Sequence, residues 1–228
     1  MFSKEAFKSV IRAWRGYLFL IVALLLVRGA IADWYNVPTG SMKPTIIEGD
    51  RVFVNKMAYG LRVPFTETII SQWGEPQRGE IVVFHSPEDG TRLIKRVIGL
   101  PGDTLEMRDN RLLINGKMLE YSPADKSYPV TLWENEGHRD VIDELLAGHR
   151  HPIALTQANI LIEDFAPLTV PANQYFMMGD NRHNSADSRV IGFVDRSLIL
   201  GRASHVVMSL DYDNHYLPRK GRILTKLP

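Results

Sequence analysis

The chain of 228 residues contains no cysteine, almost no net charge and only one long apolar run. The absence of cysteine excludes disulfides, thiolate metal sites, covalent haem attachment and cysteine nucleophiles. Lys and Arg number 27 against 26 Asp and Glu, so no bulk basic field favours a nucleic-acid partner. No group of His, Asp and Glu has the spacing of metal ligands, and we therefore expect neither a metal nor another cofactor.

The apolar run covers residues 17–27 and extends to 13–31 if Arg15 and Arg28 direct their charged ends outward. At that length it approaches the roughly 20 residues that a membrane-spanning helix needs. Four basic residues and one acidic residue precede the run, whereas Arg28 is the only cation between it and Ser41. This bias predicts that residues 1–12 are cytoplasmic, that 13–31 form a single anchor and that the remainder lies outside.

Two other interpretations of the N-terminal segment stay open at this point. The small residues Ala30 and Ala32 flank Ile31 in a pattern typical of a signal-peptide cleavage site. Cleavage there would also export the remainder. A buried helix of a soluble core is the third interpretation, but it leaves the basic residues before the run unexplained.

The whole chain has 45% hydrophobic and 23% charged residues, and the part that follows residue 31 alternates short apolar runs with proline. These runs predict a mainly β fold, an antiparallel core with an insertion. We expect strands within residues 51–56, 80–86, 91–99, 111–120, 158–164, 173–180, 192–195 and 203–210. Asn115-Gly116 predicts a type I′ hairpin turn, whereas 141–148 has a helical pattern within an otherwise polar, irregular stretch at 122–152. We assign 32–103 and 173–228 to the core and 104–172 to an inserted second lobe.

Ser41 follows Gly40 in a short segment that has Pro38 and Pro44 on its two sides. Glycine allows close approach of the backbone to a ligand and proline stiffens a loop, so Ser41 could be presented on a fixed turn. An ordinary surface turn has the same composition.

Lys95 lies in a predicted strand whose alternation places it on one face with Leu93 and Val97. Burial on an apolar face lowers the pKa of a lysine, because the charged form loses its hydration. An amine that is neutral near pH 7 can act as a general base. The alternative is a lysine at the sheet edge that extends its amine into water.

The third candidate is the polar loop 179–189, which follows an apolar strand. Asp187 and Arg189 are a natural ion pair there, and Ser185 supplies an orienting hydroxyl. A solvated turn is the alternative interpretation. His183 would suit a Ser-His-Asp triad, but we give it no role.

Taken together, these segments resemble the bacterial type I signal peptidases, the membrane-anchored serine proteases of peptidase family S26. The resemblance rests on three blocks in the family's order and on the N-terminal anchor. The blocks are PTGSMKPTIIEGDRVFVNKMAYG (38–60), RGEIVVFHSPEDGTRLIKRVIGLPGD (78–103) and GDNRHNSADSRVIGFV (179–194), followed by GRA (201–203).

The resemblance implies a Ser/Lys dyad with Ser41 as nucleophile and Lys95 as general base. It implies that Thr39 and the Ser41 backbone form the oxyanion hole and that Ser185, with the pair Asp187 and Arg189, supports the dyad. The remaining positions match residues that line the shallow pockets for small substrate side chains. They are Tyr35, Val37, Met42, Ile46 and Ile94.

The function implied is removal of N-terminal signal peptides from exported precursor proteins, after small residues of Ala-x-Ala type, at the outer face of the bacterial inner membrane. The partners implied are these precursors and the lipid bilayer. The sequence departs from many relatives at His183 and at Thr39, and some relatives have two spans before the nucleophile where this chain has one predicted span. A peptidase dedicated to one secretion or conjugation system and a non-enzymatic exported β-rich binding module remain as alternatives.

Overall fold

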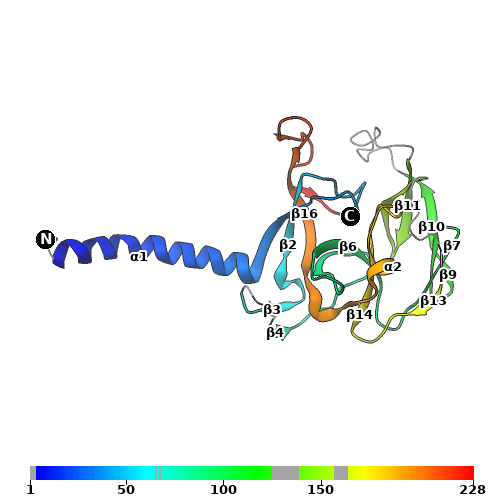
Figure 1. Cartoon of the computed structure of the whole chain (residues 1–228), viewed down its shortest axis with the longest axis horizontal. Coiled ribbons are helices and arrows are strands. Elements are labelled where there is room, and N and C mark those ends of the chain that lie inside the picture. Colours follow the sequence, from blue (N-terminus) through cyan, green and yellow to red (C-terminus); the bar gives the residue numbers. More distant parts are fainter. Residues whose placement is uncertain (1–3, 65, 67, 125–138, 157–163) are drawn as a thin grey trace.

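The computed structural model describes residues 4–64, 66, 68–124, 139–156 and 164–228. A long N-terminal helix projects from a body built almost entirely of β-strands (Figure 1). The structure thus confirms the predicted mainly β fold with one apolar helix at its N-terminus.

The N-terminal helix α1 (Lys4–Leu26) continues into the π-helical segment η1 (Val27–Ile31). Its segment Ala13–Ile31 is long and apolar enough to cross a membrane, and none of it is buried against the body. Length and composition make this segment a candidate membrane span, and membrane anchoring stays a prediction.

The largest sheet in the described part of the chain has nine antiparallel strands. Its main path runs through β1 (Ala32–Asn36), β2 (Asp50–Asn55), β16 (Ile199–Asp211), β5 (Ile81–His85), β6 (Arg92–Gly99), β14 (Gln174–Met178) and β15 (Val194–Asp195). The short strands β17 (Leu217–Pro218) and β18 (Thr225–Lys226) pair with β16. A separate hairpin of β3 (Gly60–Arg62) and β4 (Ile69–Gln72) lies beside the end of the helix in Figure 1.

The central strand β5 shows why this sheet is stable. Ile81 and Val83 pack in one buried apolar cluster, whereas Val82 and Phe84 pack in another. Because successive side chains of a strand point to opposite faces, β5 is buried on both faces of the sheet. This explains the uninterrupted apolar run at this strand.

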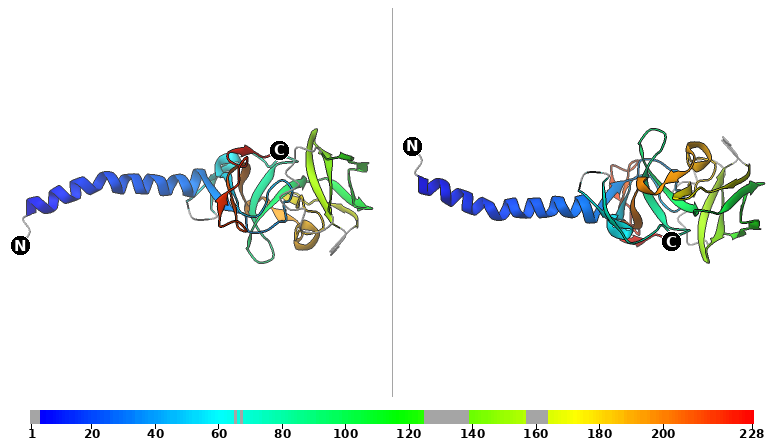
Figure 2. Two further views of the ribbon diagram at one scale, coloured as in Figure 1. Left: turned by 90° about the horizontal axis from the view of Figure 1, so that it is seen from above. Right: turned by 90° about the horizontal axis from the view of Figure 1, so that it is seen from below.

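The strands between residues 104 and 169 form two smaller sheets at the end of the body opposite the helix (Figure 2). One contains β7 (Thr104–Arg108), β8 (Arg111–Ile114), β9 (Lys117–Met118) and β13 (Phe165–Thr169). The other contains β10 (Glu120–Pro123), β11 (Arg139–Leu146) and β12 (His149–Thr156). The predicted turn at Asn115-Gly116 joins β8 to β9, with φ of 53° and 76°. The assignment of 104–172 as an insertion stays a prediction.

The helical pattern at 141–148 gave a wrong prediction, because β11 occupies this segment. Ala147 and Gly148 have φ of 50° and 82°, and this left-handed turn returns the chain as β12. Ile142 is then opposite Ile153 in the antiparallel register, so long-range pairing overrides the local pattern. The irregular structure expected at 122–152 is also wrong where the chain is described, and most of the strand expected at 158–164 lies outside the described residues.

Short helical turns complete the structure. They are η2 (Lys56–Ala58), α2 (Ser188–Ile191) and η5 (Arg196–Leu198).

Candidate active site

Ser41 and Lys95 are 54 residues apart in the chain, and their side chains meet in the structure. Ser41 lies in the loop between β1 and β2, and Lys95 lies in β6. The Lys95 Nζ donates a hydrogen bond of 2.6 Å to the Ser41 Oγ. Both residues are buried, with 9% of Ser41 and 2% of Lys95 exposed. A hydroxyl and an amine are therefore in proton-transfer contact away from bulk water.

Burial changes the ionisation of Lys95. It lowers the pKa of this amine from its usual range to about 8, because the charged form loses its hydration. The charges of Asp187 and Asp180 act in the opposite direction, and the Arg189 guanidinium adds to the lowering. A substantial fraction of Lys95 is consequently uncharged at mildly alkaline pH.

Both nearby carboxylates are held by arginines. The Arg189 Nε and Nη2 donate to the two oxygens of Asp187, each at 2.8 Å. Arg96 donates to both oxygens of Asp180 at 2.8 and 2.7 Å. Among the described residues, neither carboxylate forms a salt bridge with Lys95.

The loop 179–189 also fixes the position of the Ser41 loop. The Asn181 backbone N–H donates to the Ser41 carbonyl at 3.1 Å, and its side-chain amide donates to the Gly40 carbonyl at 3.0 Å. Gly179 permits this approach, because a Cβ there would lie 2.4 Å from the Ser41 carbonyl oxygen. Asn181 stands in a quoted sequence block, but its contact with the serine loop required the structure.

Ser185 lies beside this contact, since a Cβ on Gly179 would also lie 2.3 Å from the Ser185 Oγ. The Ser185 Oγ is buried, and its side chain lies close enough to Asp187 to help lower the pKa of that carboxyl. The structure therefore places Ser185 next to the serine loop, and its role in supporting Lys95 stays a prediction.

A pocket of about 150 Å³ opens beside the Ser41 and Lys95 side chains. Thr39 and three of the predicted pocket residues, Tyr35, Val37 and Ile94, line it. Met42 and Ile46 are not among the residues that line this pocket, because both are fully buried in the apolar cluster that contains Val37, and their role in substrate binding stays a prediction. They support the wall of the pocket rather than forming its surface.

The backbone of β6 offers an open edge at this pocket. β6 pairs with β5 from Arg92 to Arg96, but its register with β14 includes only residues from Arg96 to Gly99. The stretch 92–95, which lines the pocket, is therefore paired on one side only among the described residues. An extended peptide can add to such an edge through main-chain hydrogen bonds.

A second buried cluster, which the sequence analysis missed, joins β11 and β12 to the polar loop. Arg182 forms a bidentate pair with Glu144, with the Arg182 Nη1 and Glu144 Oε2 atoms 2.9 Å apart. His151 lies 3.4 Å from Glu144, and burial lowers its pKa. Glu144 and His151 occur in the stretch predicted to be irregular, so no pattern linked them to the loop.

His183, to which no role was given, contacts Asn110 through its Nε2 at 3.0 Å. No group of three or more His, Asp or Glu side chains that could hold a metal occurs in the described residues.

The model of the family "Signal peptidase, peptidase S26" matches residues 10–208 of the chain. Signal peptidase I of Pseudomonas aeruginosa is 37% identical over 207 residues, which cover 86% of this chain and 71% of the relative. Signal peptidase I P of Bacillus subtilis subsp. natto is 37% identical over 218 residues, which cover 94% of this chain and 99% of the relative.

A crystal structure of a signal peptidase I from Enterococcus faecalis matches 57% of this chain and 97% of its own, at 33% identity and a TM-score of 0.38. The extent of the family match and the identity to two relatives over most of their length establish the relationship. The chain belongs to the signal peptidase family, peptidase family S26.

Proposed function

We propose that this protein is a membrane-anchored serine endopeptidase that removes N-terminal signal peptides from exported precursor proteins. The observation that carries the proposal is the buried contact of 2.6 Å between the Lys95 amine and the Ser41 hydroxyl. Its family membership supports the reaction class, and the pocket beside Ser41 offers a place for the peptide.

In the proposed mechanism, uncharged Lys95 removes the proton of Ser41 while the serine oxygen attacks the scissile carbonyl. The ammonium then donates a proton to the leaving amine, and the same amine activates the water that hydrolyses the acyl-enzyme. The Ser41 backbone N–H and the Thr39 hydroxyl stabilise the oxyanion. One donor of this kind contributes about 3–4 kcal/mol to the transition state.

Substrate recognition follows from the same geometry. An extended peptide adds to the open edge of β6 at 92–95 and directs alternate side chains into the pocket. Tyr35, Val37 and Ile94 restrict the pocket, which favours small residues before the cleavage site. Discrimination by size is about 1–3 kcal/mol per methylene, so the extended conformation must contribute to specificity.

Membrane anchoring through 13–31 would place this pocket near the bilayer surface, because Ser41 follows the end of the apolar segment by ten residues. The basic residues before the segment place the N-terminus in the cytoplasm and the body on the outer side. Signal peptides of precursors end at the same level, so enzyme and cleavage site would meet there.

The test uses the full chain in liposomes with a precursor that carries an Ala-x-Ala site. We expect wild-type protein to release the mature product and Ser41→Ala to release none while retaining the wild-type circular dichroism spectrum and liposome association. A matched Ser122→Ala variant, far from the site, controls for loss of a serine hydroxyl. Cleavage by Ser41→Ala at the wild-type rate would overturn the proposal.

A further inference from the structure

A second pocket, of about 290 Å³, lies between the end of the N-terminal helix and the main sheet. Gly29 and Ala30 of η1 form one wall, and Tyr35 of β1 is shared with the pocket beside Ser41. Four basic or titratable side chains line it, and none of the described residues that line it is acidic. They are Lys56, Arg62, His85 and Arg92.

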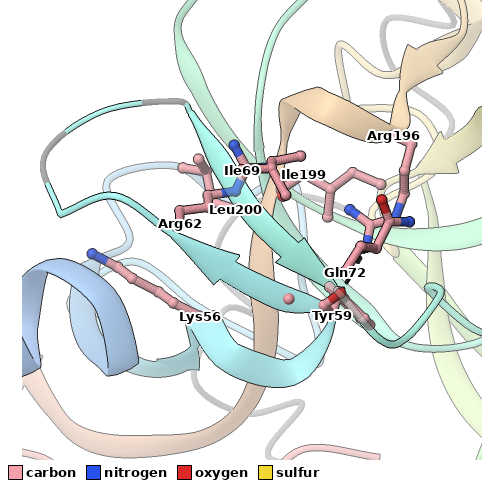
Figure 3. Close-up of a pocket in the computed structure, with 9 residues that line it drawn as sticks. Lys56, Tyr59, Arg62, Ile69, Gln72, Arg196, Ile199 and Leu200 are labelled. Atoms are coloured by element: carbon pink, nitrogen blue, oxygen red, sulfur yellow. Dashed lines mark hydrogen bonds between the residues drawn. The ribbon is translucent and has the colours of Figure 1, made fainter.

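Lys56 and Arg92 are directed toward the same aromatic ring. The Arg92 Cζ lies 4.3 Å from the centre of the Tyr35 ring, and the Lys56 Nζ lies 5.8 Å from it. Figure 3 shows Lys56 extending its amine toward the end of the N-terminal helix, where it donates to the Arg28 carbonyl at 2.8 Å. Two cations are thereby gathered at one wall of the pocket.

The carboxylate nearest to these cations neutralises them only in part. Asp33 pairs with Arg28 at 2.8 Å and lies 3.5 Å from the Lys56 Nζ, so one acid serves two cations. Arg92 has no ion pair within the described residues. The pocket therefore holds an excess of positive charge that favours an anion.

The position of the pocket indicates which anion is available. The segment that can cross a membrane ends at Ile31, directly after the residues that form the pocket wall. Trp34, which is 49% exposed, follows this end, and tryptophan is enriched at the level of lipid headgroups. With 13–31 in the bilayer, the pocket lies at the depth of the phosphate groups.

We propose that this pocket binds the phosphate group of an anionic phospholipid, with Lys56 and Arg92 as its principal ligands. The proposal rests on the membrane anchoring proposed above. Because Tyr35 and Arg92 line both pockets, a bound headgroup would fix the wall that the substrate passes on its way to Ser41. A lipid would thereby set the distance of the peptidase site from the bilayer.

The experiment measures lipid binding without reference to peptidase activity. The full chain in uncharged detergent is titrated with short-chain phosphatidylglycerol, short-chain phosphatidylcholine and inorganic phosphate, and the thermal unfolding midpoint is followed. We expect a saturable rise with phosphatidylglycerol. We expect Lys56→Gln/Arg92→Gln to bind it roughly 30-fold more weakly, since each charge near an anionic headgroup contributes about 1 kcal/mol.

The matched control is Lys117→Gln/Arg111→Gln, at the end of the body remote from the helix. It removes the same charge, and its arginine lies over a tyrosine ring in a similar way, 5.5 Å from the centre of the Tyr121 ring. We expect this variant to bind like the wild type. If the pocket double variant does not fold, the single change Arg92→Gln replaces it, because Arg92 is exposed.

Three results would overturn the proposal. In the first, phosphatidylcholine raises the midpoint as much as phosphatidylglycerol does. In the second, inorganic phosphate reproduces the effect at equal concentration, which would make the site one for free phosphate. In the third, the pocket variant responds like the wild type. None of these outcomes depends on whether Ser41 cleaves precursors, so the two proposals fail separately.

Discussion

Lys95 and Arg96 are neighbours in β6, but their side chains lie on opposite faces of the sheet and have partners of different charge. Each is only 2% exposed. On one face Lys95 meets the uncharged hydroxyl of Ser41 at 2.6 Å. On the other face Arg96 meets both oxygens of Asp180. The first arrangement favours loss of a proton, and the second retains a fixed charge.

The difference shows that burial alone does not decide whether a basic side chain keeps its proton. Lys43 is also buried, but it forms an ion pair with Glu48 at 2.7 Å. Lys95 has carboxylates nearby, yet Arg96 and Arg189 hold them. The proposed general-base role of Lys95 therefore depends on its burial and also on the arginines that pair with the neighbouring carboxylates.

The largest effect on cleavage is expected from replacing Lys95 with an arginine, which gives both faces of β6 a permanently charged side chain. Lys95→Arg keeps a positive charge but cannot lose a proton near neutral pH. We expect the rate of precursor cleavage to fall at least about 10⁴-fold, as measured by single-turnover assays in liposomes. The surface change Lys117→Arg is the matched control. Cleavage by Lys95→Arg within tenfold of wild type would refute the general-base role.

The next effect concerns the opposite face. Arg96→Met leaves the buried Asp180 carboxylate without its guanidinium partner, and removing one member of such a pair costs about 3–5 kcal/mol. We expect a loss of this size in the free energy of unfolding, measured by denaturant titration in detergent. Arg96→Met/Asp180→Asn removes both charges and should recover part of the loss. Equal losses for the single and double variants would show that the pair is not the cause.

The sequence pattern predicted the strand framework, and the family resemblance implied the contact between Ser41 and Lys95, but the residues that support this contact were predicted less well. Alternation placed Lys95 on an apolar face, and that inference needed only neighbours in one strand. The Arg182–Glu144 pair required knowing that 141–148 returns as a hairpin, which the helical pattern concealed. Met42 and Ile46 were expected at the pocket surface, but the depth of a side chain depends on packing that a motif does not specify.

The smallest effect is a shift in the pH dependence of cleavage. It tests whether the arginine paired with Asp187 influences the pKa of Lys95. Since the pKa of Lys95 is lowered to about 8, the uncharged amine and the cleavage rate should decline as the pH falls through that value. Arg189→Gln removes a cation that lowers this pKa and frees Asp187, whose negative charge raises it. Both changes favour the ammonium, so we expect the acid limb of the pH–rate profile to move upward by about one unit.

The measurement is the pH dependence of kcat/KM for a soluble signal-peptide substrate, which reports ionisation in the free enzyme. Arg189→Lys keeps the positive charge beside Asp187 and should retain the wild-type acid limb. A structural defect would lower kcat/KM at every pH without shifting the acid limb of the profile. Release of Asp187 would instead shift the acid limb to higher pH and leave kcat/KM at high pH unchanged. An unshifted limb in Arg189→Gln would mean that burial of Lys95 lowers its pKa without help from the arginine on the neighbouring acid.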